Sequence, residues 1–183
     1  MSLSWLPNAI TGLRILLIPP VLWFILSGSY REALALFVIA GFSDGLDGFL
    51  ARRYGWHSRL GGLLDPLADK LLVAGMFVTL TLVGAIPLWL TLVVVGRDVT
   101  ILGGATAYNL LIKPVEGEPT MIGKFNTAIT LLYVFMVLCQ LATAWPPEPV
   151  LIVLGAATFV TVAISGIDYV VSWSRRARKE GNR

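Results

Sequence analysis

Six apolar segments separated by short breaks determine what this chain can fold into. Each segment is close to the roughly 20 residues that an α-helix needs to cross the hydrocarbon core of a bilayer. The segments cover approximately residues 8–26, 32–54, 62–86, 88–112, 122–143 and 150–173. The breaks contain glycine and proline, which are typical of turns, as in Ser27-Gly28-Ser29 and in the proline-rich run 145–149. We therefore predict an all-α integral membrane protein with six transmembrane helices.

The composition excludes an ordinary soluble domain. Of the 183 residues, 56% are apolar and 14% are charged, against about 25% charged residues in soluble domains. A soluble domain of this length could not bury so much apolar surface, so lipid must solvate much of it. The length is that of one domain, and we predict a single transmembrane domain over residues 1–183 with a basic tail at 174–183. No cleavable signal peptide is expected, because the N-terminus lacks a charged region and a small-residue cleavage site.

Basic residues gather at one set of segment ends. They stand in the loop 52–61, at Lys113 and Lys124, and in the tail, whereas the opposite loops carry only Arg31. With an even number of spans, the positive-inside rule places both termini and the loop 52–61 in the cytoplasm. The predicted location is a bacterial-type inner (plasma) membrane. The tail is expected to contact anionic lipid headgroups, and no nucleic-acid partner is expected, because the chain has no other basic surface.

Four aspartates stand where a membrane segment should carry no charge. Asp44 and Asp47 lie in the second segment, and Asp65 and Asp69 lie near the start of the third. A carboxylate at membrane depth costs roughly 3 kcal/mol or more, so its presence indicates a partner or a function. At 100° per residue, each pair shares one face of its helix. A short hairpin would bring all four carboxylates to one depth.

Four carboxylates in a small space of low dielectric constant require cations, because like charges repel strongly there. Oxygen ligands suit hard ions such as Mg²⁺, Mn²⁺ or Ca²⁺ rather than zinc. Two ions bridged by shared carboxylates would support in-line displacement at phosphorus. The residues alone leave two other interpretations open: structural pairing of the acids with Arg52, Arg53 and Lys70, or an ion relay in a transporter.

The spacing of these residues resembles the signature of the CDP-alcohol phosphotransferase family. The pattern D-x₂-D-G-x₂-A-R-x₈-G-x₃-D-x₃-D is complete over 26 residues, at Asp44, Asp47, Gly48, Ala51, Arg52, Gly61, Asp65 and Asp69. The resemblance implies a six-helix membrane bundle, commonly homodimeric, whose active site opens to the cytoplasm. It implies that the four aspartates bind two divalent cations, Mg²⁺ or Mn²⁺, and that Asp69 is also the general base. Gly48, Ala51, Arg52 and Gly61 would line the site for the CDP-lipid.

Three further motifs resemble elements of phosphatidylglycerophosphate synthases and eukaryotic-type cardiolipin synthases within that family. They are Asn8-x₂-Thr11-x₂-Arg14, Arg97-Asp98 and Lys124-Phe125-Asn126-Thr127. The resemblance implies that Asn8 and Thr11 belong to the CDP-lipid site. It implies that the acceptor is bound by Arg14, Arg97, Lys124 and Asn126. The sixth segment carries no such motif, and Tyr169 within it has no assigned role.

The predicted reaction is the transfer of a phosphatidyl group from CDP-diacylglycerol to an alcohol acceptor, with release of CMP. The acceptor is a phospholipid or a polyol phosphate. Phosphatidylglycerol, which gives cardiolipin, is preferred on two features. Glycerophosphate enzymes more often carry glutamate where Asp98 follows Arg97, and they tend to carry a second lysine where Asn126 stands. Glycerol 3-phosphate is the alternative acceptor. Alternatives of other classes are an ion-coupled membrane transporter and a non-catalytic protein of the same fold.

The predicted orientation can be tested by cysteine labelling in a Cys139→Ser background, since Cys139 is the only cysteine of the chain. Single cysteines at Ser58, Ser29 and Glu148 place one reporter on the expected cytoplasmic side and two on the opposite side. A membrane-impermeant reagent applied to intact cells should label positions 29 and 148 and spare position 58. The reverse pattern would invert the topology.

Overall fold

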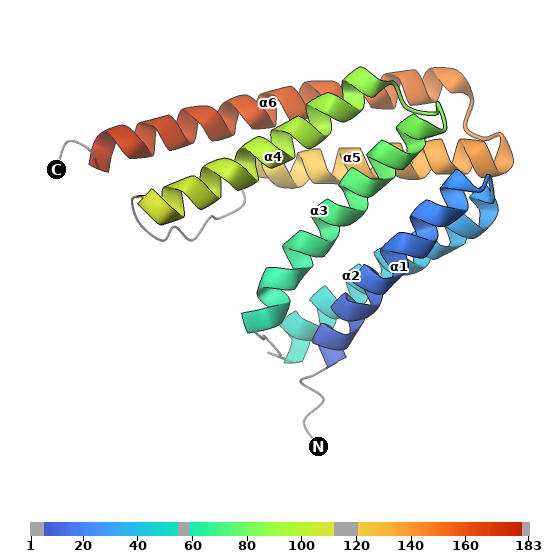
Figure 1. The fold of residues 1–183 in the computed structure, drawn as a ribbon, viewed down its shortest axis with the longest axis horizontal. Coiled ribbons are helices and arrows are strands. Elements are labelled where there is room, and N and C mark those ends of the chain that lie inside the picture. Colours follow the sequence, from blue (N-terminus) through green and yellow to red (C-terminus); the bar gives the residue numbers. More distant parts are fainter. Residues whose placement is uncertain (1–5, 55–58, 112–120, 181–183) are drawn as a thin grey trace. The chain divides into compact units, whose positions relative to one another are not determined.

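The structure, a computed structural model, describes the backbone at residues 6–54, 59–111 and 121–180 and the side chains at residues 12–43, 67–104 and 121–169. The described backbone forms helices without strands (Figure 1). The helices are α1 (Leu6–Leu26), α2 (Tyr30–Tyr54), α3 (Arg59–Leu82), α4 (Leu88–Leu111), α5 (Met121–Thr143) and α6 (Glu148–Glu180). The all-α prediction is confirmed for these residues, and each predicted segment corresponds to one helix.

Two helix C-termini differ from the prediction by several residues. Helix α3 stops at Leu82 rather than at 86, because Gly84 adopts φ +79° and begins a turn. The amides of Gly84 and Ala85 donate to the carbonyls of Thr81 and Leu80, which is the Schellman pattern of a helix C-terminus. Helix α6 continues to Glu180 rather than stopping at 173. Its charged run consists largely of Arg, Lys, Ala and Glu, which are good helix formers.

The outer surface of the helices is rich in apolar side chains. Two helical stretches among the described residues, Met121–Thr143 and Glu148–Tyr169, are long and apolar enough to cross a membrane, and Gly12–Leu26 is a shorter apolar stretch. On α6, Val153, Val160, Ile164 and Ile167 form one exposed stripe. A stripe of this kind in a soluble protein would be a liability. The surface agrees with a membrane protein, and the six-span arrangement stays a prediction.

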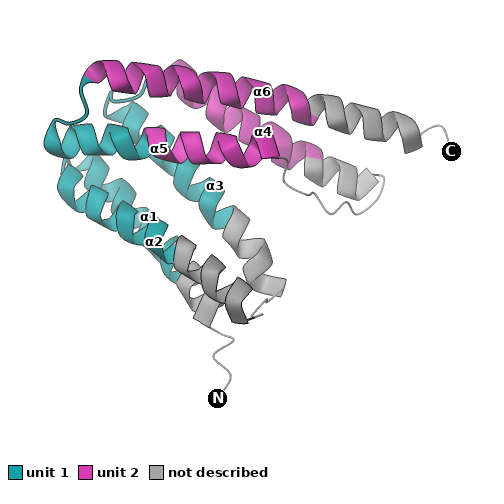
Figure 2. Cartoon of the chain, turned by 180° about the vertical axis from the view of Figure 1, so that it is seen from behind, with its two compact units in different colours: residues 1–86, 134–147 teal, residues 87–133, 148–183 magenta. Residues whose placement is uncertain are grey.

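The chain divides into two compact units, coloured separately in Figure 2. Unit 1 comprises Met1–Ile86 and Val134–Pro147, and unit 2 comprises Pro87–Tyr133 and Glu148–Arg183. The boundary therefore falls inside α5. The division describes contacts between helices, and the prediction of one transmembrane domain over the whole chain stays a prediction.

Unit 1 is built around α1, which packs against both α2 and α3. Its buried residues recur every three or four positions, as expected for helices that each present one face to a core. They include Ile18, Val21 and Ile25 on α1, Ala33, Phe37 and Ala40 on α2, and Ala68, Leu72, Met76 and Leu80 on α3. Gly75 gives α1 room on α3, since a Cβ there would lie 2.9 Å from Cδ1 of Leu22.

In unit 2, helix α4 packs against α6. The rings of Trp89 and Phe159 meet edge to face, with centroids 5.5 Å apart and planes at 77°. Further along both helices, Arg97 of α4 donates a hydrogen bond to Ser165 of α6. Because the contacting residue numbers increase together, the two helices run in the same direction.

We expect Gly75→Leu to lower the free energy of unfolding by about 1–3 kcal/mol, because a large side chain would be forced into the packed contact between α1 and α3. Gly41→Leu is the matched control, since nothing lies within 4 Å of a Cβ built at Gly41. This control should stay within about 0.5 kcal/mol of the wild type. Thermal unfolding of the detergent-solubilised proteins measures both, and equal melting temperatures would contradict the close approach of α1 and α3.

Candidate functional site

Five of the predicted site residues have described side chains: Arg14, Asp69, Arg97, Lys124 and Asn126. The other predicted residues lie outside the described side chains, namely Asn8, Thr11, Asp44, Asp47, Gly48, Ala51, Arg52, Gly61 and Asp65. The backbone at all these positions is helical, in α1, α2 or α3. The signature therefore runs from α2 into α3, as predicted, while the roles of its members stay predictions.

The described part of the signature is an ion pair between two helices of unit 1. Nη1 of Arg14 on α1 donates to Oδ1 of Asp69 on α3 at 2.8 Å. The Arg14 side chain is 1% exposed, whereas the Asp69 side chain is 47% exposed. Sequence analysis assigns Asp69 to the metal and the base and Arg14 to the acceptor. The structure places these two residues, which have different predicted roles, in direct contact.

The packing of α1 on α3 explains the unequal exposure of this pair. Arg14 precedes Ile18 and Val21 by four and seven positions, so it shares their buried face. Asp69 follows the buried Ala68 and therefore lies at the edge of the α3 core face. A buried guanidinium needs an anionic partner, and Asp69 supplies it. The Asp69 carboxylate remains half exposed.

The donor set suits hard divalent cations. The described side chains contain no group of three or more His, Cys, Asp or Glu residues that could hold a metal ion, because three of the four predicted ligands lie outside them. Carboxylate oxygens are the ligands that Mg²⁺ and Mn²⁺ accept. Asp69 fits this set, since its carboxylate is half exposed.

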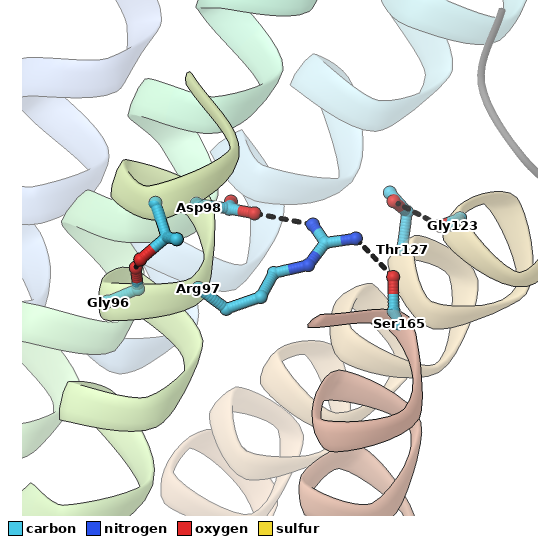
Figure 3. A network of polar contacts seen from close by, with 7 residues as sticks. Gly96, Arg97, Asp98, Gly123, Thr127 and Ser165 are labelled. Carbon is cyan, nitrogen blue, oxygen red and sulfur yellow. Dashed lines mark hydrogen bonds and ion pairs between the residues drawn. The ribbon is translucent and has the colours of Figure 1, made fainter. Parts of the chain in front are cut away.

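A second polar cluster lies in unit 2 and centres on Arg97, as Figure 3 shows. Nη1 of Arg97 donates to Oδ1 of Asp98 at 2.6 Å, and Nη2 donates to Oγ of Ser165. The guanidinium carbon lies 5.6 Å from the centre of the Tyr169 ring, within the range of a cation–π interaction. Side-chain exposure is 12% for Arg97 and 21% for Asp98. This is a neutral, largely buried ion pair with α6 closing one side.

The start of α5 belongs to the same unit. Asn126 is 5% exposed, and its Oδ1 has no hydrogen-bond partner among the described residues. The buried hydroxyls of Thr130 and Thr158 likewise have none there. Lys124 is exposed, and Thr127 donates to the carbonyl of Gly123 at 3.0 Å (Figure 3). Unit 2 thus contains three of the four predicted acceptor residues, and unit 1 contains Arg14.

Ser165 and Tyr169 are functional candidates that the sequence does not predict. The sixth segment carries no family motif, yet both residues contact Arg97. A usable signal existed in the spacing of Thr158 and Ser165, which lie two turns apart on one face of an otherwise apolar helix. Gly166 adds to the contact, since a Cβ there would stand 3.6 Å from Cγ of Arg97. The backbone of α6 therefore approaches the aliphatic part of the Arg97 side chain.

Comparison with known proteins gives one family. The family model described as CDP-alcohol phosphatidyltransferase matches residues 4–168. The cardiolipin synthase (CMP-forming) of Rattus norvegicus is 33% identical over 180 residues, covering 90% of this chain and 60% of that protein. A probable phosphatidylglycerophosphate synthase of Mycobacterium tuberculosis is 30% identical over 173 residues, covering 90% and 79%.

A third relative is similar over nearly its whole length. The CDP-diacylglycerol–glycerol-3-phosphate 3-phosphatidyltransferase of Aquifex aeolicus is 28% identical over 179 residues, covering 95% of this chain and 98% of that protein. By contrast, the chain spans about 60% of the length of the rat and human cardiolipin synthases.

Arg14→Gln should lower the free energy of unfolding by about 2–3 kcal/mol, because the shorter side chain leaves space at a buried position and no longer reaches Asp69. Asp69 adds little to this loss, since its half-exposed carboxylate can be hydrated. Arg31→Gln is the matched control: Arg31 is exposed and donates to the Ala142 carbonyl at 3.3 Å. Its effect should stay below about 1 kcal/mol, and equal losses in thermal unfolding would contradict the structural role of Arg14.

Proposed function

Because the chain belongs to the CDP-alcohol phosphatidyltransferase family, we propose that it transfers a phosphatidyl group from CDP-diacylglycerol to an alcohol acceptor and releases CMP. The observation that carries this proposal is the complete aspartate signature, 44–69, inside the matched residues 4–168. The names of the relatives from rat, M. tuberculosis and A. aeolicus support the same class of reaction.

Asp69 acts as the general base in this reaction. Arg14 donates to its Oδ1, and the half-exposed carboxylate accepts the proton of the acceptor hydroxyl. As that proton moves to Asp69, the acceptor oxygen bonds to the β-phosphorus of CDP-diacylglycerol, and the bond from this phosphorus to the CMP oxygen breaks. We prefer direct attack by the acceptor hydroxyl on phosphorus, since no Ser or His of the sequence resembles a dedicated catalytic nucleophile.

The family chemistry implies two divalent cations, Mg²⁺ or Mn²⁺, with Asp44, Asp47, Asp65 and Asp69 as their ligands. When bound, such ions neutralise the pyrophosphate and stabilise negative charge on departing CMP. Asn8, Thr11, Gly48, Ala51, Arg52 and Gly61 complete the proposed site for the CDP-lipid. The small side chains of Gly48 and Ala51 leave room for the ligand, and Arg52 offers charge to its phosphates.

Phosphatidylglycerol is the proposed acceptor, with cardiolipin as the product. The residues proposed for acceptor binding are Arg14, Arg97, Lys124 and Asn126, as the resemblance implies. Asp98 lies 2.6 Å from Arg97, so the pair is locally neutral and suits a phosphodiester with one charge better than a dianion. The buried amide of Asn126 offers hydrogen bonds without charge. Glycerol 3-phosphate is the second candidate, favoured by the names of the M. tuberculosis and A. aeolicus relatives.

The proposed setting is a bacterial-type inner membrane, crossed six times, with both termini and the active site on the cytoplasmic side. The charge bias of the loops and the apolar surface of α6 support this setting. The resemblance supports a homodimer, which light scattering of the purified detergent-solubilised protein would test. A single-chain mass at all protein concentrations would exclude it.

Purified protein should release CMP from CDP-diacylglycerol in the presence of Mg²⁺ or Mn²⁺ and none in EDTA. Asp69→Asn should bind CDP-diacylglycerol and turn over at least about 100-fold more slowly, because the base is lost. Asp44→Asn and Asp65→Asn should raise the metal concentration needed for half-maximal rate, because each removes a charged ligand. Near-wild-type turnover by Asp69→Asn would refute the base assignment, and no CMP release under any condition would favour a transporter or a non-catalytic protein.

The acceptor is decided by giving the purified enzyme CDP-diacylglycerol with either phosphatidylglycerol or glycerol 3-phosphate. We expect cardiolipin from phosphatidylglycerol, because the Arg97–Asp98 pair and Asn126 provide little net positive charge for a dianion. Product lipids separated by chromatography give the answer. Robust phosphatidylglycerophosphate formation without any cardiolipin would reverse the choice of acceptor and leave the reaction class intact.

A further inference from the structure

The guanidinium of Arg97 is fixed from two directions. Asp98, on the same helix α4, accepts from Nη1, and Ser165 on α6 accepts from Nη2. Two hydrogen bonds to different nitrogens determine the direction of the planar group. The Tyr169 ring, 5.6 Å from the guanidinium carbon, restricts its tilt as well. Figure 3 shows the side chain extended from α4 toward Ser165, with Asp98 at the other guanidinium nitrogen.

Ser165 is not needed to neutralise this charge. Asp98 already supplies the anion, at 2.6 Å, whereas the Ser165 hydroxyl is neutral and 0% exposed. Its contribution is therefore directional: it determines where the guanidinium points. Gly166 lets the α6 backbone lie along the Arg97 stem, so that Ser165 is within reach.

Donor capacity is left over for a ligand. A guanidinium has five N–H donors, and two of them donate to Asp98 and Ser165. Nε is buried and has no hydrogen-bond partner among the described residues. On α5 of the same unit, Oδ1 of Asn126 is also buried without a partner there. Buried polar groups of this kind usually find a partner, such as a water molecule or a ligand.

We infer that Ser165, assisted by Tyr169, is a positioning residue that orients Arg97 for the phosphate of the acceptor. This inference rests on the proposed function, because it takes Arg97 as a ligand of the acceptor. Helix α6 then takes part in acceptor recognition without itself touching the acceptor. Loss of the Ser165 hydroxyl leaves the charge of Arg97 in place, but the guanidinium is no longer held in one orientation. Acceptor binding therefore weakens, while CDP-diacylglycerol binding does not.

Ser165→Ala is the principal variant, since it removes one oxygen and adds no volume. The KM for the acceptor should rise about tenfold or more, as expected for the loss of a hydrogen bond to a charged group. The KM for CDP-diacylglycerol should not change. Thr158→Ala is the matched control: Thr158 is also 0% exposed on the same face of α6, and its hydroxyl has no hydrogen-bond partner among the described residues. Both KM values should be unchanged in this control.

A double-mutant cycle with Arg97→Gln separates positioning from general structural support. If Ser165 acts through Arg97, Ser165→Ala should add nothing further in the Arg97→Gln background. Additive effects, an equal rise in both KM values, or the same effect in Thr158→Ala would overturn the inference. Should Ser165→Ala fail to fold, Tyr169→Leu must show the same selective rise in the acceptor KM.

Ligand-induced stabilisation distinguishes failure of this inference from failure of the proposed function. The melting temperature is measured with and without phosphatidylglycerol, and with and without glycerol 3-phosphate. Stabilisation of the wild type that Ser165→Ala reduces, without any CMP release, would refute the transferase proposal and retain the positioning role. CMP release together with equal stabilisation of wild type and Ser165→Ala would retain the transferase and refute the positioning role. Absence of both stabilisation and CMP release would refute both.

Discussion

A guanidinium placed between apolar helices has to find an anion or a hydrogen-bond acceptor, and this requirement organises both units. Arg14 meets it across α1 and α3, and Arg97 meets it at the contact of α4 with α6. These are also helix pairs that pack together. The apolar faces bring the helices into contact, and the buried arginines determine which polar side chains must stand opposite one another. Most of the predicted functional residues with described side chains belong to these two clusters.

The helices could be predicted because apolar length and turn glycines are local properties of the chain. The end of α3 could not, since Val83, Ala85 and Ile86 continue the apolar run while Gly84 turns the backbone. The opposite error occurred in α6, where hydropathy falls at 173 but the helix continues to Glu180. Hydropathy reports the preferred solvent of a segment, whereas a helix ends where backbone hydrogen bonding ends. The two agree only where a turn coincides with a polar break.

The site was predictable as a linear pattern and less so as a set of contacts. The spacing of the signature shows which residues share a helix face, but the contact between Arg14 and Asp69 depends on how α1 packs on α3. Ser165 and Tyr169 could not be predicted for another reason. A search for charges in apolar segments finds residues that are costly in lipid, and a serine or tyrosine in a membrane helix costs little. Neutral partners of a buried charge become visible only when the charge is placed.

The ion pair also bears on how Arg14 takes part in the proposed reaction. Its side chain is 1% exposed and Nη1 already donates to Asp69, so direct contact with an acceptor phosphate would require Arg14 to leave the buried face of α1. The carboxylate that it holds is 47% exposed and needs no such movement. The geometry therefore favours an Arg14 that acts through Asp69, by orienting the carboxylate that we propose as the base. The Arg97 side chain is 12% exposed, which makes it the better candidate for direct contact with the acceptor phosphate.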